Sequence, residues 1–189
     1  MAELIRSVMS NFTLTFLVLG IAAALIAVAR KADGFTRENL AEALLAYFIL
    51  FTIAIAYFYN FVVHVFFGEV AADFIGWADS PFQAEVGYAS LGFAAVGLLA
   101  FRGNSMVRLA SILGPALFQW GAAVEHIRDM IATGNMAPGK AGVVFYSDIF
   151  LPVIGFALLW FKRAADRSRP FREHGIDDRT RLICPAHGR

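Results

Sequence analysis

The chain has 189 residues, of which 59% are hydrophobic and 16% are charged, and its formal net charge is +1. Soluble domains carry roughly a quarter charged residues, so this composition indicates a protein that folds in lipid. The small net charge excludes a general electrostatic attraction to nucleic acid, and the single cysteine, Cys184, excludes an intrachain disulfide. The sequence also contains no Cys/His zinc spacing, phosphate-binding loop or nucleophile elbow.

Five long apolar runs follow one another along the chain. Because a bilayer core of roughly 30 Å needs about 20 apolar residues in a helix, they predict an all-α integral membrane bundle of five transmembrane helices. The predicted spans cover residues 12–29, 40–67, 81–101, 105–126 and 141–161. The transmembrane domain then occupies residues 1–161, and residues 162–189 form a polar, basic tail.

The first span has an alternative interpretation as a cleaved signal peptide. Ala27-Val28-Ala29 has the small-residue spacing of a signal-peptidase site. The apolar run is long for such a peptide, however, and Arg30 and Lys31 follow it directly. A retained first span is therefore expected, whereas cleavage would leave four spans in the same orientation.

The stretch 76–87 marks the point where the chain turns at a membrane surface and enters it again. Ser80 suits the N-cap of the third span, and Pro81 suits its first helical position, where a missing N–H costs nothing. This start carries Gln83 and Glu85 into an otherwise apolar helix.

Lysine and arginine residues alternate between the predicted loops. The first loop, the third loop and the tail are basic and the second loop has neither residue, while Lys140 makes the fourth loop depart from the pattern. The positive-inside rule then predicts a multi-pass protein of the cell inner membrane, with its N-terminus outside and its C-terminus in the cytoplasm. The expected partner is the lipid bilayer, and the basic tail is expected to touch anionic lipid. Trp77 and Trp160 are expected to anchor the chain at the membrane interfaces.

This topology gathers ionisable residues from several spans in the outer leaflet. Charged groups at membrane depth are costly and indicate a functional site by default. Two imidazoles and two carboxylates suit iron, zinc or manganese. The predicted metal ligands are His64, Glu85, His126 and Asp148. The residues predicted to support these ligands or a bound cofactor are Asn60, Gln83 and Tyr146.

Each of these residues also has a structural interpretation. A histidine at a helix end is often only interfacial, and no fixed ligand motif contains His64 or His126. A hydrogen bond or salt bridge that only joins helices accounts equally well for Glu85 and Asp148. Other charged side chains are expected to be solvated at helix ends, where they balance the helix dipole or pair along the helix. These are Glu42, Glu125, Arg128 and Asp129.

The segment Trp77–Gly87 reads W-A-D-S-P-F-Q-A-E-V-G. It resembles an uncharacterised family of bacterial and archaeal multi-pass membrane proteins with the motif W-x-x-S-P-F-Q-x-E-V-G, a domain of unknown function. In that family a glycine-rich helix and a later histidine follow the motif, and here they correspond to Gly92, Gly97 and His126. The resemblance covers residues 73–129 and rests mainly on this one motif. It implies an intact membrane domain in which the motif glutamine and glutamate are positions of interest, and it supplies no activity.

Three functions stay open on the sequence alone. The first is a metal- or cofactor-binding, redox-active membrane protein with its site in the outer leaflet; haem between two histidines ranks lower, because carboxylates would face the porphyrin. The second is a small proton- or cation-coupled transporter or channel. The third is a non-catalytic accessory or assembly subunit that binds a membrane-complex partner or another copy of itself. No motif assigns a reaction, so whether the protein is an enzyme is left open.

Overall fold

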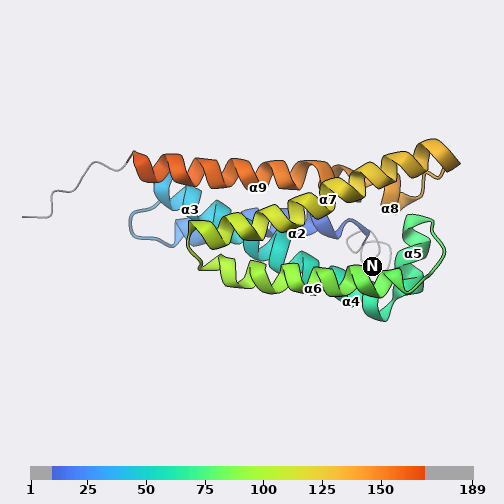
Figure 1. The fold of residues 1–189 in the computed structure, drawn as a ribbon. Helices are drawn as coiled ribbons and strands as arrows, with labels where there is room; N and C mark the ends of the chain where they lie inside the picture. The colour runs from blue at the N-terminus through green and yellow to red at the C-terminus, as the bar shows by residue number, and fades with distance from the viewer. Residues whose placement is uncertain (1–9, 169–189) are drawn as a thin grey trace, which may run out of the picture.

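The computed structural model describes residues 10–168, which form helices and turns and no strand (Figure 1). Residues 1–9 and 169–189, which include most of the predicted tail and Cys184, lie outside the described residues. The helices are α2 (Phe12–Ala29), α3 (Arg37–Phe48), the π-helix η1 (Ile49–Ile55), α4 (Ala56–Phe66), α5 (Gly68–Ile75), α6 (Phe82–Phe101), α7 (Ser105–Thr133), α8 (Pro138–Ala141) and α9 (Val143–Arg167).

Five helical segments are long and apolar enough to cross a membrane, which confirms the all-α fold with five spans. The second span is continuous through α3, η1 and α4, and the fifth joins α8 to α9. Helix α7 continues beyond the predicted end at His126 because its charged residues keep helical geometry past the apolar run. It ends where Gly134 adopts the left-handed conformation at φ 70°, a common helix stop. Helix α9 similarly continues to Arg167, past the predicted start of the tail at residue 162.

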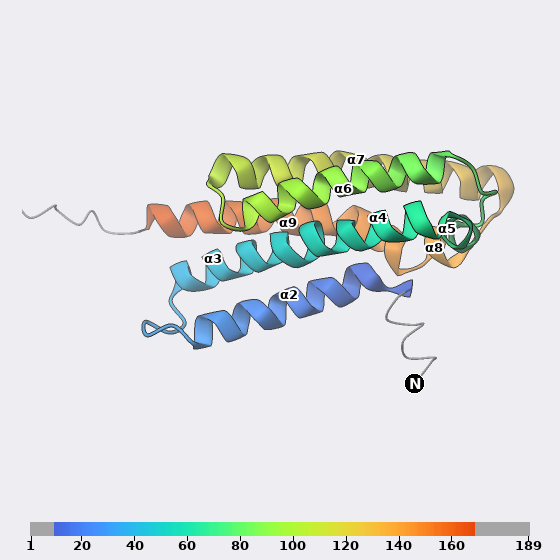
Figure 2. The same cartoon turned by 90° about the horizontal axis from the view of Figure 1, so that it is seen from below.

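The long helices lie side by side, and their connections gather at two ends (Figures 1 and 2). One end, called the basic end below, holds the α2–α3 loop, the α6–α7 turn and the C-terminal part of α9. The other, called the α5/α8 end, holds the two short helices, in segments for which the sequence predicted only loops. Helix α5 ends at Gly76, whose φ of 78° lets the chain turn back toward α6.

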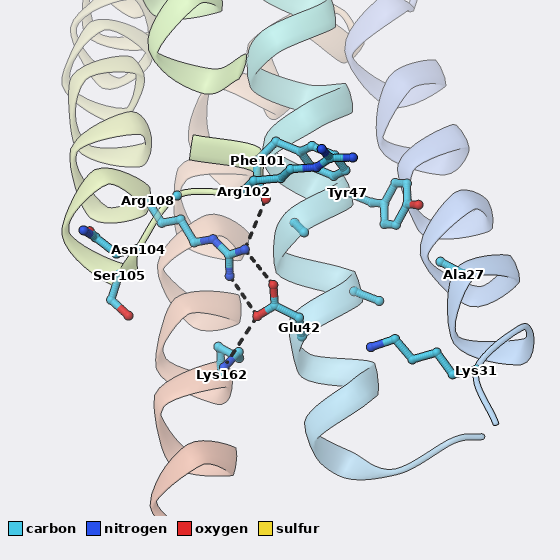
Figure 3. Close-up of a pocket in the computed structure, with 13 residues that line it drawn as sticks. Ala27, Lys31, Glu42, Tyr47, Phe101, Arg102, Asn104, Ser105, Arg108 and Lys162 are labelled. Carbon is cyan, nitrogen blue, oxygen red and sulfur yellow. Dashed lines mark hydrogen bonds and ion pairs between the residues drawn. The ribbon is translucent and has the colours of Figure 1, made fainter. Parts of the chain in front are cut away.

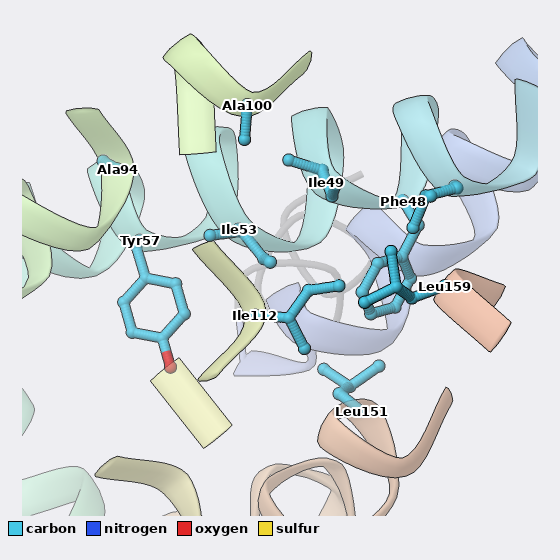
Figure 4. Close-up of a cluster of buried hydrophobic side chains, with 10 residues drawn as sticks. Phe48, Ile49, Ile53, Tyr57, Ala94, Ala100, Ile112, Leu151 and Leu159 are labelled. Carbon is cyan, nitrogen blue, oxygen red and sulfur yellow. The ribbon is translucent and has the colours of Figure 1, made fainter. Parts of the chain in front are cut away.

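The second span is the central element of the bundle. In its apolar window 61% of the residues are buried inside the protein, against 22% for the first span, so the other helices pack around it. Its buried side chains Phe48, Ile49 and Ile53 meet Ile112 of α7 and Leu151 of α9 (Figure 4). Helix α2 lies at the margin of the bundle, against α3 and η1 (Figure 2).

Helix α6 approaches the second span closely at Gly97. A Cβ added there would lie 2.9 Å from the backbone nitrogen of Ala54, whereas a Cβ at Gly92 on the same helix would meet nothing within 4 Å. We expect Gly97→Ala to destabilise the protein by about 1–3 kcal/mol through overpacking. Gly92→Ala should be neutral or slightly stabilising, since alanine favours helix. Thermal unfolding of both variants in mild detergent checks this, and equal melting temperatures would contradict it.

Candidate functional site

A cavity with a volume of about 620 Å³ opens at the basic end (Figure 3). It is called the basic pocket below. Its charged lining residues are Lys31, Glu42, Arg102, Arg108 and Lys162. Its apolar wall is formed by Ala27, Ala43, Ala46, Tyr47 and Phe101. The pocket therefore combines four basic side chains and one carboxylate with an apolar surface.

A bidentate ion pair between Arg108 of α7 and Glu42 of α3 forms one side of the pocket (Figure 3). The Arg108 Nη1 and Nη2 atoms donate to the two Glu42 carboxylate oxygens at 2.9 and 2.6 Å. The same guanidinium donates to the carbonyl oxygens of Ala100 and Phe101 at 3.3 and 3.2 Å. Arg108 thereby ties the C-terminal end of α6 to α3. Glu42, predicted as a solvated dipole-balancing residue, is instead half of this pair, because a buried guanidinium needs a counter-charge.

Helix α9 joins the same network through Lys162. Its Nζ lies 3.5 Å from Glu42 Oε2 and 2.6 Å from both carboxylate oxygens of Asp166, one turn further along the helix. The positive charges of Arg108 and Lys162 are thus largely neutralised by carboxylates within the protein. Their main effect is to hold three helices together around the pocket.

The other two basic residues of the pocket have no carboxylate partner among the described residues. Lys31 Nζ donates to the Asn39 side-chain oxygen at 3.0 Å, and Arg102 stacks over the ring of Phe101. The N-terminus of α7, capped by Asn104 through the N–H groups of Met106 and Val107, borders the same space. Two uncompensated cations and the positive end of a helix make this part of the pocket suited to an anion.

At the α5/α8 end, polar side chains of the predicted site pair with one another across α4 and α6. His64 Nδ1 donates to the Gln83 side-chain oxygen at 2.7 Å, and Gln83 is buried. The Asn60 amide donates to the Ser90 hydroxyl at 2.9 Å. These contacts satisfy polar groups that would otherwise face the apolar interior.

A second group of polar side chains, called the cap cluster below, comprises Trp77, His126, Asp129 and Lys140. Asp129 accepts from the Trp77 indole N–H at 3.3 Å and forms an ion pair with the fully buried Lys140, whose Nζ lies 5.1 Å from the centre of the Trp77 ring. The ring of His126 lies against Trp77. Trp77 and Asp129 therefore form structural contacts between α7, α8 and the turn before α6. Asp129, predicted to be solvated at a helix end, is instead partly buried in an ion pair.

The remaining predicted site residues are separate from both groups. Asp148 is buried in α9. Glu85 and Tyr146 are exposed on the outside of α6 and α9. Glu85 faces away from the bundle because the buried side of α6 is set by Gln83, Gly87 and Ser90. The four predicted metal ligands thus lie in different surroundings, and the described part of the chain holds no group of three His, Cys, Asp or Glu side chains that could bind a metal. The metal-site hypothesis is unsupported.

A family model described as a family of unknown function, DUF6790, matches residues 10–168. The chain belongs to the DUF6790 family. The match covers all five spans and both ends of the bundle, and it ends where the described residues end. Neither a curated protein nor a solved structure matches the chain.

The basic pocket of this DUF6790 protein was not recognised from the sequence. The positive-inside rule considers only how many basic residues each loop carries. Lys31, Arg102 and Lys162 were therefore interpreted as separate loop charges and not as parts of one site. The signal that could have revealed the pocket is a pair of opposite charges inside two spans at the same end, Glu42 and Arg108. A charge within a span requires a partner at the same depth, and spacing alone does not show which helices are neighbours.

Proposed function

We propose that this membrane protein binds an anionic amphiphile, with a phosphate-type headgroup and an apolar chain, in the basic pocket. The observation that carries the proposal is the cavity of about 620 Å³ with four basic side chains and an apolar wall. That volume lies within the range of small-molecule sites, roughly 300–1,000 Å³. Lys31 and Arg102 would contact the headgroup, and the wall around Tyr47 and Phe101 would contact the start of the chain.

The position of the pocket supports a lipid rather than a water-soluble anion. It lies where α2 and α6 end and α7 begins, so its depth along the bundle corresponds to the headgroup region of a bilayer. Basic side chains at that level are attracted to anionic lipids, and each contributes about 1 kcal/mol to binding. We also propose that the protein resides in the cell inner membrane. Its basic end would face the cytoplasm, as the positive-inside rule favours.

A second candidate function is a non-catalytic accessory subunit of a membrane complex. The observation that favours it is that polar residues at the α5/α8 end pair inside the protein, His64 with Gln83 and Asp129 with Lys140. Such pairs hold helices together. The metal-centre and transporter hypotheses stay predictions with no supporting contact at the residues first assigned to them.

Binding of fluorescent phosphatidylglycerol to the purified protein in uncharged detergent tests the proposal. We expect the double variant Lys31→Gln/Arg102→Gln to bind it roughly tenfold more weakly than a matched double variant outside the pocket. The matched control is Arg30→Gln/Arg163→Gln, which removes the same charge from exposed positions of the same end that do not line the pocket.

Two outcomes would contradict the proposal. Equal losses in the two double variants would show that diffuse surface charge, and no pocket, attracts the lipid. Full displacement of the lipid by millimolar inorganic phosphate would show that a free anion, and no amphiphile, is the ligand. Phosphatidylcholine, which carries no net charge, should bind weakly to all of these proteins.

A further inference from the structure

The chain leaves the bundle beside the basic pocket. Helix α9 reaches the basic end, where its Lys162 lines the pocket and Ser168 is the last described residue (Figure 1). At a rise of 1.5 Å per residue, Ser168 lies about 9 Å beyond Lys162 along the helix. Residues 169–189 follow it in the sequence. Their side chains are therefore tethered to a point next to the pocket.

The sequence just beyond α9 contains one short acidic segment. Residues 173–178 read E-H-G-I-D-D, with three carboxylates and no lysine or arginine, and are called the acidic segment below. Ile176 within it and Phe171 just before it add apolar side chains. Arginines flank it on both sides, at positions 169, 172, 179 and 181. The acidic segment thus combines negative charge with apolar groups, as the lining of the basic pocket requires of an occupant.

The pocket contains two cations that can pair with these carboxylates. Glu42, the one carboxylate in its lining, is already shared by Arg108 and Lys162. Lys31 and Arg102, by contrast, have no carboxylate partner within residues 10–168. Complementary charges favour one partner over others when two surfaces meet. The acidic segment can supply the missing partners, and its apolar side chains match the apolar wall of the pocket.

The connection between α9 and the acidic segment is long enough for the chain to fold back. An extended chain spans at most about 3.3–3.6 Å per residue, so residues 169–173 cover up to roughly 17 Å. That exceeds the distance of about 9 Å by which Ser168 lies beyond Lys162. A short tether also gives an effective concentration in the millimolar range. A contact with a dissociation constant of about 1 mM would therefore form in roughly half of the molecules.

We propose that the acidic segment of this chain occupies the basic pocket when no lipid is bound there. Its carboxylates would pair with Lys31 and Arg102, and Ile176 would lie on the apolar wall. The flanking arginines would contact the anionic surface of the membrane. The segment would then be an internal competitor that a lipid headgroup must displace. This regulatory role rests on the proposed function of the pocket, whereas the contact itself does not depend on a lipid ligand.

Disulfide cross-linking of the full chain in uncharged detergent, with no lipid added, tests the contact. In a Cys184→Ser background, Ile176→Cys is combined with Ser105→Cys, at an exposed position that lines the pocket. A disulfide requires the two Cα atoms to lie within about 7 Å of each other. We expect mild oxidation to link this pair several times faster than a control pair of Ile176→Cys with Ala32→Cys. Ala32 is exposed at the same end of the bundle and does not line the pocket.

Removing two carboxylates of the acidic segment tests both the contact and the competition. Adding Asp177→Asn/Asp178→Asn to the first cysteine pair should slow its cross-linking to the rate of the control pair. Without the cysteine substitutions, this double variant should bind fluorescent phosphatidylglycerol roughly three- to tenfold more tightly than the wild type, because a larger fraction of its pockets is open. The matched control Asp33→Asn/Glu38→Gln removes the same charge from the basic end at positions that do not line the pocket, and its affinity should stay close to that of the wild type.

The proposal fails on either of two results. Equal cross-linking at positions 105 and 32, or a rate at position 105 that Asp177→Asn/Asp178→Asn leaves unchanged, would show that the acidic segment does not occupy the pocket. Equal gains in lipid affinity in the two double variants would show that general surface charge, and no competition, controls binding. A charge-dependent cross-link in a protein that binds no lipid would support the contact and would contradict the proposed function instead.

Discussion

Replacing Asp129 with alanine is expected to destabilise the folded protein by about 3–5 kcal/mol, the cost of leaving a buried charge without its partner. Lys140, the residue left behind, is fully buried, and its amino group pairs with Asp129. The substitution also removes the acceptor of the Trp77 indole N–H. The free energy of unfolding in mild detergent, from a denaturant titration, measures this loss.

Two further variants make this prediction specific to the buried pair. Glu125→Ala breaks an ion pair with Arg128 in which both side chains are more than half exposed, so it should change stability by at most about 1 kcal/mol. The double variant Asp129→Ala/Lys140→Met removes both charges and should recover much of the lost stability. The interpretation would be wrong if Asp129→Ala and Glu125→Ala cost the same.

The second large effect is expected at the basic end. Arg108→Ala removes a buried guanidinium that makes four hydrogen bonds, to Glu42 and to the carbonyls that end α6. We expect a loss of about 3 kcal/mol, the lower part of the range for buried pairs, because Glu42 is 38% exposed and can regain water. Denaturant titration again gives the value.

A graded comparison tests whether the geometry of this network determines the effect. Lys162 lies 3.5 Å from Glu42 and has an alternative partner in Asp166, so Lys162→Ala should cost about 1 kcal/mol. In a double-mutant cycle, Glu42→Ala and Arg108→Ala should be coupled by about 1–3 kcal/mol. Additive effects of these two substitutions would show that the pair contributes nothing as a unit.

The sequence was sufficient to predict the five spans and the turn before α6. Length and hydropathy determine a membrane helix almost completely, since the bilayer sets both. The start of α6 was predicted to within one residue: Pro81 is the N-cap and Phe82 the first helical residue, and no side chain caps the helix, so the predicted N-cap at Ser80 was wrong. The π-helix at residues 49–55 had no local signal: its sequence, ILFTIAI, is an ordinary apolar run. Its geometry depends on the neighbours that pack against it.

The candidate site was less predictable for a related reason. The sequence predicted that polar residues gather in one layer of the bundle, but it could not show how they divide between helix pairs. His64 meets Gln83 because α4 packs on α6, and Asp129 meets Lys140 because α8 folds back under α7. The rotation of each helix about its axis also decides exposure, which is why Glu85 faces outward while Gln83, two residues earlier, is buried.

The central place of the second span has a consequence for how the protein is made. This span is the second to leave the ribosome, yet its buried surface is covered by α6, α7 and α9, which are synthesised later. Until α9 arrives, the carboxylate of Glu42 lacks Lys162, and much of the span faces lipid or an insertion chaperone. Helix α2, which is synthesised first, covers another part of this surface along α3 and η1. Assembly is therefore expected to finish only after translation of α9, and a nascent chain truncated before Lys162 should be an early target for membrane proteases.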